Sequence, residues 1–401
     1  MRHRRHLAAV RGVGLTRFGI WTERSLLDLL AEAALRALED ADMARSSVDA
    51  VYVASMGAGM LQGQAGLSSL LVDRLSLFPA AADLVENGSA SGASAVKNGV
   101  LAIASGLFET VLVVGGKKMH QPERWQSTDF AARATHPEVE YPYGITMPGL
   151  AGMFGRLFME KYGLTREHLV AVAVKNQEMG ARNPFAHLTR VVTRADLLVQ
   201  DTSPVNNPLV ADPLRLYDAC PVSDGAAALV LTRAEIAREG PHPAVIVSGL
   251  GHATDLQALQ ERPDPTELRA VRLASHQAFA GAAIRPTDVD VAELHDAFTI
   301  LEIAESEEVG FFAPGQGGPA ALASDTGLDG RPAINISGGL KARGHPLGAT
   351  GVAQVVELVY QLRHGLPSNR QVVEAHTGFS LNMGGLGNNV VAFVLQRRED
   401  V

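Results

Sequence analysis

Apolar positions along this chain fall either in short runs or at helical spacing, and the two patterns take turns. In the first 120 residues, runs with the length and composition of strands occur at 7–13, 51–55, 81–85 and 110–115. Between them, residues 25–41 carry leucine and alanine at the spacing of an amphipathic helix. The alternation predicts an α/β fold with right-handed crossovers, in which the strand at 110–115 lies beside its predecessor in a parallel sheet.

The pattern returns in the second half of the chain after an interruption. Residues 117–220 scatter proline, glycine and aromatics, with helical spacing only at 150–162 and 165–182, and predict an inserted loop lobe. From about residue 244 the alternation resumes. The expected elements there are a helix at 268–280, a strand at 289–294, and two strands at 372–379 and 388–395 around a Gly-rich turn.

Two corners between a strand and a buried helix carry candidate chemistry. Ser89 stands between the run at 81–85 and the small, uncharged residues 90–105. A serine there either caps the helix or serves as a nucleophile close to the helix's free amide groups. His345 lies three residues before Gly348, just as Ser89 lies three residues before Gly92.

These matching corners belong to an internal duplication. Residues 41–53 and 282–294 share a pattern of helix end, turn and strand. We therefore expect two βαβαβ-type halves, each with one buried helix, packed as an α-β-α-β-α layered core that brings Ser89 and His345 together. The predicted boundaries are 1–116 with 221–240 for the first half, 117–220 for the lobe and 241–401 for the second half.

The run from Gly338 to Gly351, with Gly-His-Pro-Leu-Gly-Ala-Thr-Gly at its end, resembles the signature of the thiolase superfamily. His295-Asp296-Ala-Phe298 is similar to the motif of the sterol-carrier-protein and archaeal-type thiolases. Further stretches similar to the family lie at 172–176, 183–184 and 224–228, so that the resemblance covers nearly the whole chain. It implies the thiolase fold and a coenzyme A thioester as substrate.

The chain departs from the family pattern at two places. The family has a nucleophilic Cys where this chain has Ser89. In the late stretch 379–387, Leu381 stands where a His would be expected.

The resemblance also implies roles for four catalytic residues. Ser89 would accept the acyl group, and its hydroxyl needs a base, for which His345 is the candidate. His295 would donate a hydrogen bond to the thioester oxygen, and the amides of Ser89 and Gly385 would stabilise an oxyanion. Ser91 is a weaker nucleophile candidate, because one turn into the helix its hydroxyl is expected to bond a carbonyl.

Three functions remain open at this point. The first is acyl transfer, or Claisen-type formation and cleavage of a carbon-carbon bond, through Ser89. The second is a non-covalent carbon-carbon lyase using the two histidines, or a coenzyme A-binding subunit of a complex. The third is an engineered Cys-to-Ser variant of an active thiolase. No residue is assigned to coenzyme A contact.

Apolar residues of the lobe either line an acyl pocket or form the lobe's own core. They are Trp125, Met147, Met153, Phe154, Phe158 and Met159. The single cysteine, Cys220, lies away from both corner motifs in the sequence and is expected to be a packed small residue.

Composition narrows the partners and the location. The net charge of −8 and the lack of a long basic run argue against nucleic acid or an anionic membrane surface as a binding partner. No apolar run has the length of a membrane span, and no signal-peptide core follows the N-terminus, so a cytoplasmic protein is expected. The scattered histidines, among them His3, His6, His120 and His136, lack metal-site spacing, and no metal is predicted. The resemblance implies a homodimer formed through edge strands and, in some archaeal-type relatives, a small OB-fold partner.

Overall fold

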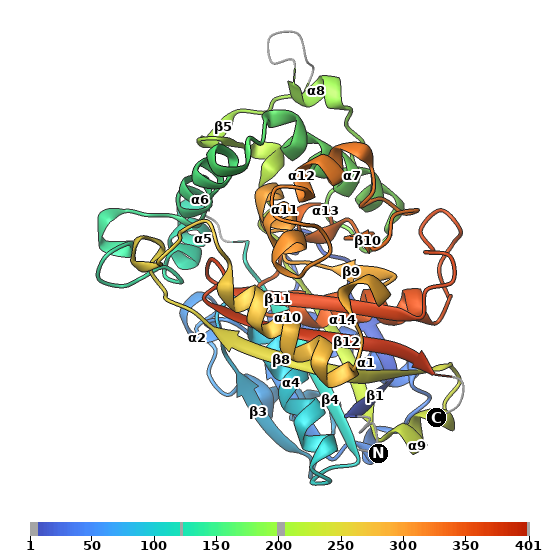
Figure 1. Cartoon of the computed structure of the whole chain (residues 1–401). Helices are drawn as coiled ribbons and strands as arrows, with labels where there is room; N and C mark the ends of the chain where they lie inside the picture. The colour runs from blue at the N-terminus through green and yellow to red at the C-terminus, as the bar shows by residue number, and fades with distance from the viewer. Residues whose placement is uncertain (1–6, 121–122, 199–204, 399–401) are drawn as a thin grey trace.

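The computed structural model describes residues 7–120, 123–198 and 205–398. Its centre is a ten-stranded sheet in the order β10-β9-β11-β12-β8-β1-β7-β4-β2-β3 (Figure 1). The strands of this sheet are β1 Ala8–Leu15, β2 Ala50–Ala54, β3 Ala81–Val85, β4 Thr110–Lys117, β7 Gly225–Thr232, β8 Ala244–Thr254, β9 Val291–Glu293, β10 Ala333–Ile334, β11 Thr377–Gly384 and β12 Asn389–Arg398. A separate hairpin pairs β5 Leu209–Ala211 with β6 Leu214–Arg215.

The α-helices account for most of the remaining regular structure. They are α1 Leu26–Asp40, α2 Ala58–Leu61, α3 Leu67–Leu75, α4 Ser91–Ala104, α5 Arg124–Ala132, α6 Met147–Tyr162, α7 Arg166–Arg182, α8 Arg194–Leu198, α9 Ala234–Arg238, α10 Arg269–Ala282, α11 Thr299–Glu308, α12 Gly317–Ala323, α13 Gly339–Arg343 and α14 Thr350–Leu362. The local sequence explains where some of these helices begin. Ser25 accepts a hydrogen bond from the Asp28 amide in a capping box at α1, and Thr146 caps α6.

The two halves of the sheet have the same topology. In the first half, β2 pairs parallel with β3 and β4, and β7 pairs antiparallel with β4 and β1. In the second half, β9 pairs parallel with β10 and β11, and β12 pairs antiparallel with β11 and β8. The predicted duplication is therefore present in the strand order itself.

The halves fold over a shared central layer of two helices. Buried residues of α4 and α14 pack together with both halves of the sheet in one apolar cluster. On the outside, α1 and α3 cover the first half and α10 and α11 cover the second. Five layers result, as the sequence predicts, and burial of the apolar faces between them is the main stabilising term.

The structure differs from expectation in how the halves meet and in the strand order. Rather than forming separate sheets, they join edge to edge where β1 pairs antiparallel with β8. The predicted adjacency of β4 and β3 is wrong, because β2 lies between them and leaves β3 at the edge.

Several elements were not predicted from the pattern. The lobe contains α5, α8 and the β5–β6 hairpin beside the two expected helices, and α3, α11 and α12 were also missed. In Figure 1, the lobe helices α5 to α8 gather at one end of the sheet, on the side where β9 and β10 lie. The lobe thus lies beside the second half of the sheet.

Candidate active site

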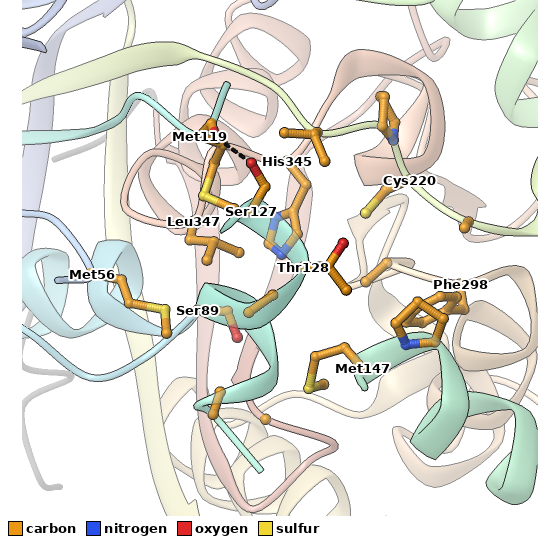
Figure 2. Close-up of a pocket in the computed structure, with 18 of the residues that line it drawn as sticks. Met56, Ser89, Met119, Ser127, Thr128, Met147, Cys220, Phe298, His345 and Leu347 are labelled. Atoms are coloured by element: carbon orange, nitrogen blue, oxygen red, sulfur yellow. Dashed lines mark hydrogen bonds between the residues drawn. The ribbon is translucent and has the colours of Figure 1, made fainter. Parts of the chain in front are cut away.

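The four predicted catalytic residues line one cavity. Ser89, His295, His345 and Gly385 all contribute to its wall, and its volume is about 170 Å³. Figure 2 shows Ser89 and His345 together with Met56, Met147 and other residues from distant parts of the chain. The fold thus brings residues from both halves and the lobe to one place.

Close packing of α4 against the start of α14 places Ser89 and His345 together. A Cβ added to Gly92 would lie 2.8 Å from the carbonyl oxygen of Gly348, and one added to Gly351 would lie 2.3 Å from the amide nitrogen of Ala93. Real Cβ atoms do not approach so closely, so only glycine allows this crossing. Gly348, three residues after His345, is also tightly packed, because a Cβ there would lie 2.4 Å from the carbonyl oxygen of Gly116 on β4. Ser89 and His345 stand just before these close contacts, and both line the same cavity.

His345 is oriented by Thr350. Its Nδ1 lies 2.7 Å from Thr350 Oγ1, and that hydroxyl donates its proton to the Pro346 carbonyl at 3.1 Å. The hydroxyl must then accept from His345, so Nδ1 carries the proton and Nε2 is an unprotonated acceptor. This is the tautomer that a general base needs.

His295 is held in the opposite tautomer. Its Nδ1 lies 2.8 Å from Asn382 Nδ2 and accepts the Met383 amide N–H at 3.4 Å. An amide N–H can only donate, so the remaining proton of the neutral ring belongs to Nε2. The ring centroids of His295 and His345 are 4.9 Å apart with planes at 88°, and the pair therefore offers the cavity one donor and one acceptor.

Burial keeps both imidazoles neutral. Burial, followed by the nearby Arg343, lowers the pKa of His345 to about 3. Burial, followed by the proximity of the His345 ring, holds the pKa of His295 well below its usual value. Both rings are therefore uncharged at neutral pH, as their hydrogen bonds require.

Ser89 does not yet face its predicted base. Its hydroxyl donates to the Met383 carbonyl at 2.9 Å, and the residue is 8% exposed. Ser91 behaves as predicted, because its hydroxyl donates to the Gly88 carbonyl at 2.6 Å. A rotation of the Ser89 side chain must precede any proton transfer to His345.

The residue after His295 fixes the loop before His345. Asp296 accepts the amide of Leu340 at 2.7 Å, and a Cβ on Gly339 would collide with its carboxylate. Burial raises the pKa of Asp296 well above its usual value. Two residues further on, Phe298 lines the cavity. The His-Asp-x-Phe motif thus supplies the His295 imidazole in the cavity, the Asp296 carboxyl that holds the loop before His345, and the Phe298 ring in the apolar wall.

The expectation for Cys220 is wrong in one respect. The residue lies in the cavity wall with Ser89 and both histidines, and Figure 2 shows its sulfur directed toward the cavity. The isolated bridge between Ala219 and Phe298 explains this, because it brings the segment across to the His295 motif. Burial raises the pKa of the Cys220 thiol to about 12, so the group is a neutral thiol.

The residues predicted for an acyl pocket lie mostly in the apolar core that the lobe shares with the second half of the molecule. Phe154, Phe158 and Met159 are buried in the apolar cluster beside α7, whereas Trp125 and Met153 are exposed. Met147 alone of the six lines the cavity. The sequence-based interpretation missed the residues that form most of the apolar wall, which include Met56, Met119, Ala131, Ala134, Val222 and Leu347. Only the position of Leu347 in the Gly-His-Pro-Leu motif gave a local signal for any of them.

The depressed pKa of His345 predicts a measurable pH dependence of stability. The folded-state pKa lies below the unfolded value of 6.5, so the unfolded chain binds the extra proton and the stabilisation is lost as the pH falls. We expect the parent protein to lose about 2 kcal/mol more than His345→Gln between pH 7 and pH 5. Urea unfolding of both proteins at the two pH values measures this difference. An identical pH dependence in the two would show that His345 is not buried as described.

Two other classes of site are absent from the described residues. No helix there has both the length and the apolar character needed to cross a membrane. Within the same part of the chain, no three His, Cys, Asp or Glu side chains are grouped to hold a metal ion.

Comparison with known proteins gives the family. Residues 8–235 match the model for the thiolase N-terminal domain, and residues 251–397 match that for the thiolase C-terminal domain-like family. An acetyl-CoA acetyltransferase of Methanothermobacter thermautotrophicus is 41% identical over 97% of this chain and 99% of its own. Sterol carrier protein 2 of Bos taurus is 31% identical over 95% of this chain and 70% of its own.

A solved structure matches even more of the fold. The Ltp2-ChsH2(DUF35) aldolase superposes with a TM-score of 0.84 at 26% identity, covering 98% of both chains. The duplicated topology, the two glycine-flanked corners and these matches agree, and the chain belongs to the thiolase family.

Proposed function

We propose that this chain transfers an acyl group from a coenzyme A thioester, with Ser89 as the acyl acceptor. The observation that carries the proposal is that Ser89 shares one cavity with His345, whose Nε2 is an unprotonated acceptor. Family membership supports the enzyme class, because the archaeal relatives are named acetyl-CoA acetyltransferases.

The first half-reaction needs a base and a leaving group. Ser89 Oγ attacks the thioester carbonyl carbon, and its proton passes to Nε2 of His345. The carbon-sulfur bond then breaks, and the coenzyme A thiolate leaves with that proton. The acyl group remains on Ser89 as an oxygen ester, from which an acceptor nucleophile removes it.

Three donors are proposed for the charge on the carbonyl oxygen. They are the Nε2–H of His295 and the amides of Ser89 and Gly385. Gly385 has a φ of +56°, a conformation that favours glycine and turns its backbone at the end of β11. One such donor contributes about 3 to 4 kcal/mol to transition-state stabilisation.

The size of the cavity favours a short acyl group. A volume of about 170 Å³ is close to that of an engineered cavity of about 150 Å³ that binds benzene. The acyl chain would lie against Met56, Met147 and Leu347.

A non-covalent carbon-carbon lyase is the second candidate. The hydroxyl of Ser89 is bonded to the Met383 carbonyl rather than to His345, and the structural relative with 26% identity is named an aldolase. In this reaction His345 would take the proton of a 3-hydroxyl group as the bond between C2 and C3 breaks. His295 would stabilise the enolate of the departing thioester, which is then protonated at carbon.

Intact mass spectrometry separates the two candidates. The protein is incubated with acetyl-CoA and the adduct is located by peptide mapping. An acetyl group on Ser89, absent from Ser89→Ala, is the result expected for acyl transfer. No adduct, together with cleavage of a 3-hydroxyacyl-CoA, would replace the proposal by the lyase.

The remaining sequence-based alternatives are tested by the same experiment. A coenzyme A-binding subunit would show neither an adduct nor cleavage. A Cys-to-Ser variant of an active thiolase would bind substrate and turn over slowly. The related aldolase carries a DUF35 partner in its name, and a small OB-fold partner for this chain remains our proposal, as does a cytoplasmic location.

We further propose a homodimer formed through the edge strand β3. This strand ends the ten-stranded sheet and has an exposed Leu84, with exposed Phe78 just before it. Exposed edges bearing apolar side chains are sites of strand pairing. The parent is expected to sediment as a dimer at micromolar concentration and Leu84→Asp as a monomer. Val373→Asp, at another exposed apolar position, is the control, and a monomeric parent would remove the proposal.

A further inference from the structure

A series of hydrogen-bonded polar side chains joins the two halves of the molecule beside the turn that carries Ser89. Each contact is a hydrogen bond between different elements. The contacts are Lys97 Nζ to His252 Nδ1 at 3.2 Å, His252 Nε2 to Asn389 Oδ1 at 2.7 Å, Asn389 Nδ2 to Asn87 Oδ1 at 2.7 Å, and Asn87 Nδ2 to Ser94 Oγ at 2.8 Å. The series starts on α4, crosses β8 and β12, and returns to α4.

One ammonium group determines the direction of the whole series. Lys97 can only donate, so Nδ1 of His252 accepts and the proton of the neutral ring lies on Nε2. That N–H requires the oxygen of Asn389, which leaves the Asn389 NH₂ facing Asn87. Asn87 must in turn present its oxygen. The orientation of three side chains therefore follows from the charge of Lys97.

The bond between the two asparagines connects the turns that carry the proposed oxyanion donors. Asn87 lies two residues before Ser89, and its backbone N–H donates a hydrogen bond to Ser91 Oγ at 2.8 Å. Asn389 pairs directly with Gly384, the neighbour of Gly385, in the β11–β12 hairpin. A Cβ built on Gly384 would lie 3.4 Å from the Asn87 carbonyl oxygen, so the two turns are in contact.

We propose that Lys97, His252 and Asn389 are positioning residues that set the spacing between the Ser89 and Gly385 amides. The inference rests on the proposed function, in which both amides bind the same oxygen atom. Since the two turns belong to different halves, a bond between them defines that spacing more directly than the packing of either half. A displacement of 1 Å at a reacting centre can lower a rate about 100-fold.

The test compares two replacements of Asn389. Asn389→Leu removes both hydrogen bonds. Asn389→Asp keeps them, because the carboxylate accepts from His252 and the Asn87 amide can turn to donate, with Ser94 donating to its oxygen. Asn98→Leu, at a half-buried position of α4 outside the series, is the matched control.

The expected result is a rate effect without a binding effect. Acetylation of Ser89 should be about 10- to 100-fold slower in Asn389→Leu, with coenzyme A affinity unchanged. Asn389→Asp and Asn98→Leu should stay within about threefold of the parent. Equal rates in the leucine and aspartate variants would overturn the proposal.

Hydrogen exchange tests the positioning role of these residues without any measurement of catalysis. Backbone amides in the turns at 86–89 and 384–387 should exchange faster in Asn389→Leu than in the parent and Asn389→Asp. If the parent forms no acyl adduct, this pattern still supports the positioning role while the proposed function fails. Parent-like exchange in both turns of Asn389→Leu would overturn the positioning role, whatever the activity.

Discussion

Replacing Ser89 by Cys is expected to accelerate acylation by acetyl-CoA by about tenfold or more, because a thiol is partly ionised at neutral pH and a hydroxyl is not. The site favours the thiolate further, since residue 89 stands just before the N-terminus of α4. The added volume is small, and folding should survive. The measurement is the rate of acetyl incorporation at residue 89 by mass spectrometry, followed by thiolysis of a 3-oxoacyl-CoA.

Two further substitutions serve as controls for acylation of thiols that the site does not activate. Cys220→Ala in the same protein removes the other thiol of the cavity. Ser69→Cys, at an exposed position of α3, reports uncatalysed acylation of an ordinary thiol. If the thiol introduced by Ser89→Cys is acylated no faster than the one introduced by Ser69→Cys and has an ordinary pKa near about 8.5, the cavity does not activate a nucleophile. The lyase would then become the leading function.

Replacing His345 by Ala should lower the rate of Ser89 acylation by about 10²- to 10⁴-fold, the usual contribution of a general base. The imidazole moves a proton rather than holding the ligand, so coenzyme A affinity should change little. The low pKa of His345 adds a second signature, because the group stays neutral and the parent rate should not fall between pH 8 and pH 5 through its protonation. Single-turnover acetylation measured over that range tests both statements.

His276→Ala serves as the matched control, since His276 is exposed on α10 and outside the cavity. It should acylate like the parent at every pH. Equal acylation rates in His345→Ala and the parent would remove His345 from the mechanism.

The site was predictable from sequence where short motifs determine geometry locally. Ser89 and His345 each precede by three positions a glycine that close packing requires, which is Gly92 at the crossing of α4 with α14 and Gly348 against β2 and β4. The duplication was readable for the same reason. Two segments with one pattern fold into equivalent elements, and the two halves of the sheet have identical strand orders.

The parts that were missed depend on contacts between distant segments. Nothing near β3 and β4 in the sequence indicates that β2 lies between them. Cys220 reaches the cavity because its neighbour Ala219 forms a bridge with Phe298, 79 positions later in the chain. Asn382, which fixes the tautomer of His295, lies in a stretch that the pattern predicts as a Gly-rich turn. Such pairings arise from the whole fold and leave no local periodicity.

The junction of β1 with β8 has a consequence for how the chain folds. β1 is synthesised first, yet its neighbours β7 and β8 are more than 200 residues downstream. Contacts of such high sequence separation form slowly, and a ribosome-bound first half would expose both the unpaired edge of β1 and the face of α4 that α14 later covers. We infer that neither half is an independent folding unit, so that chains released before about residue 250 would depend on chaperones to avoid aggregation.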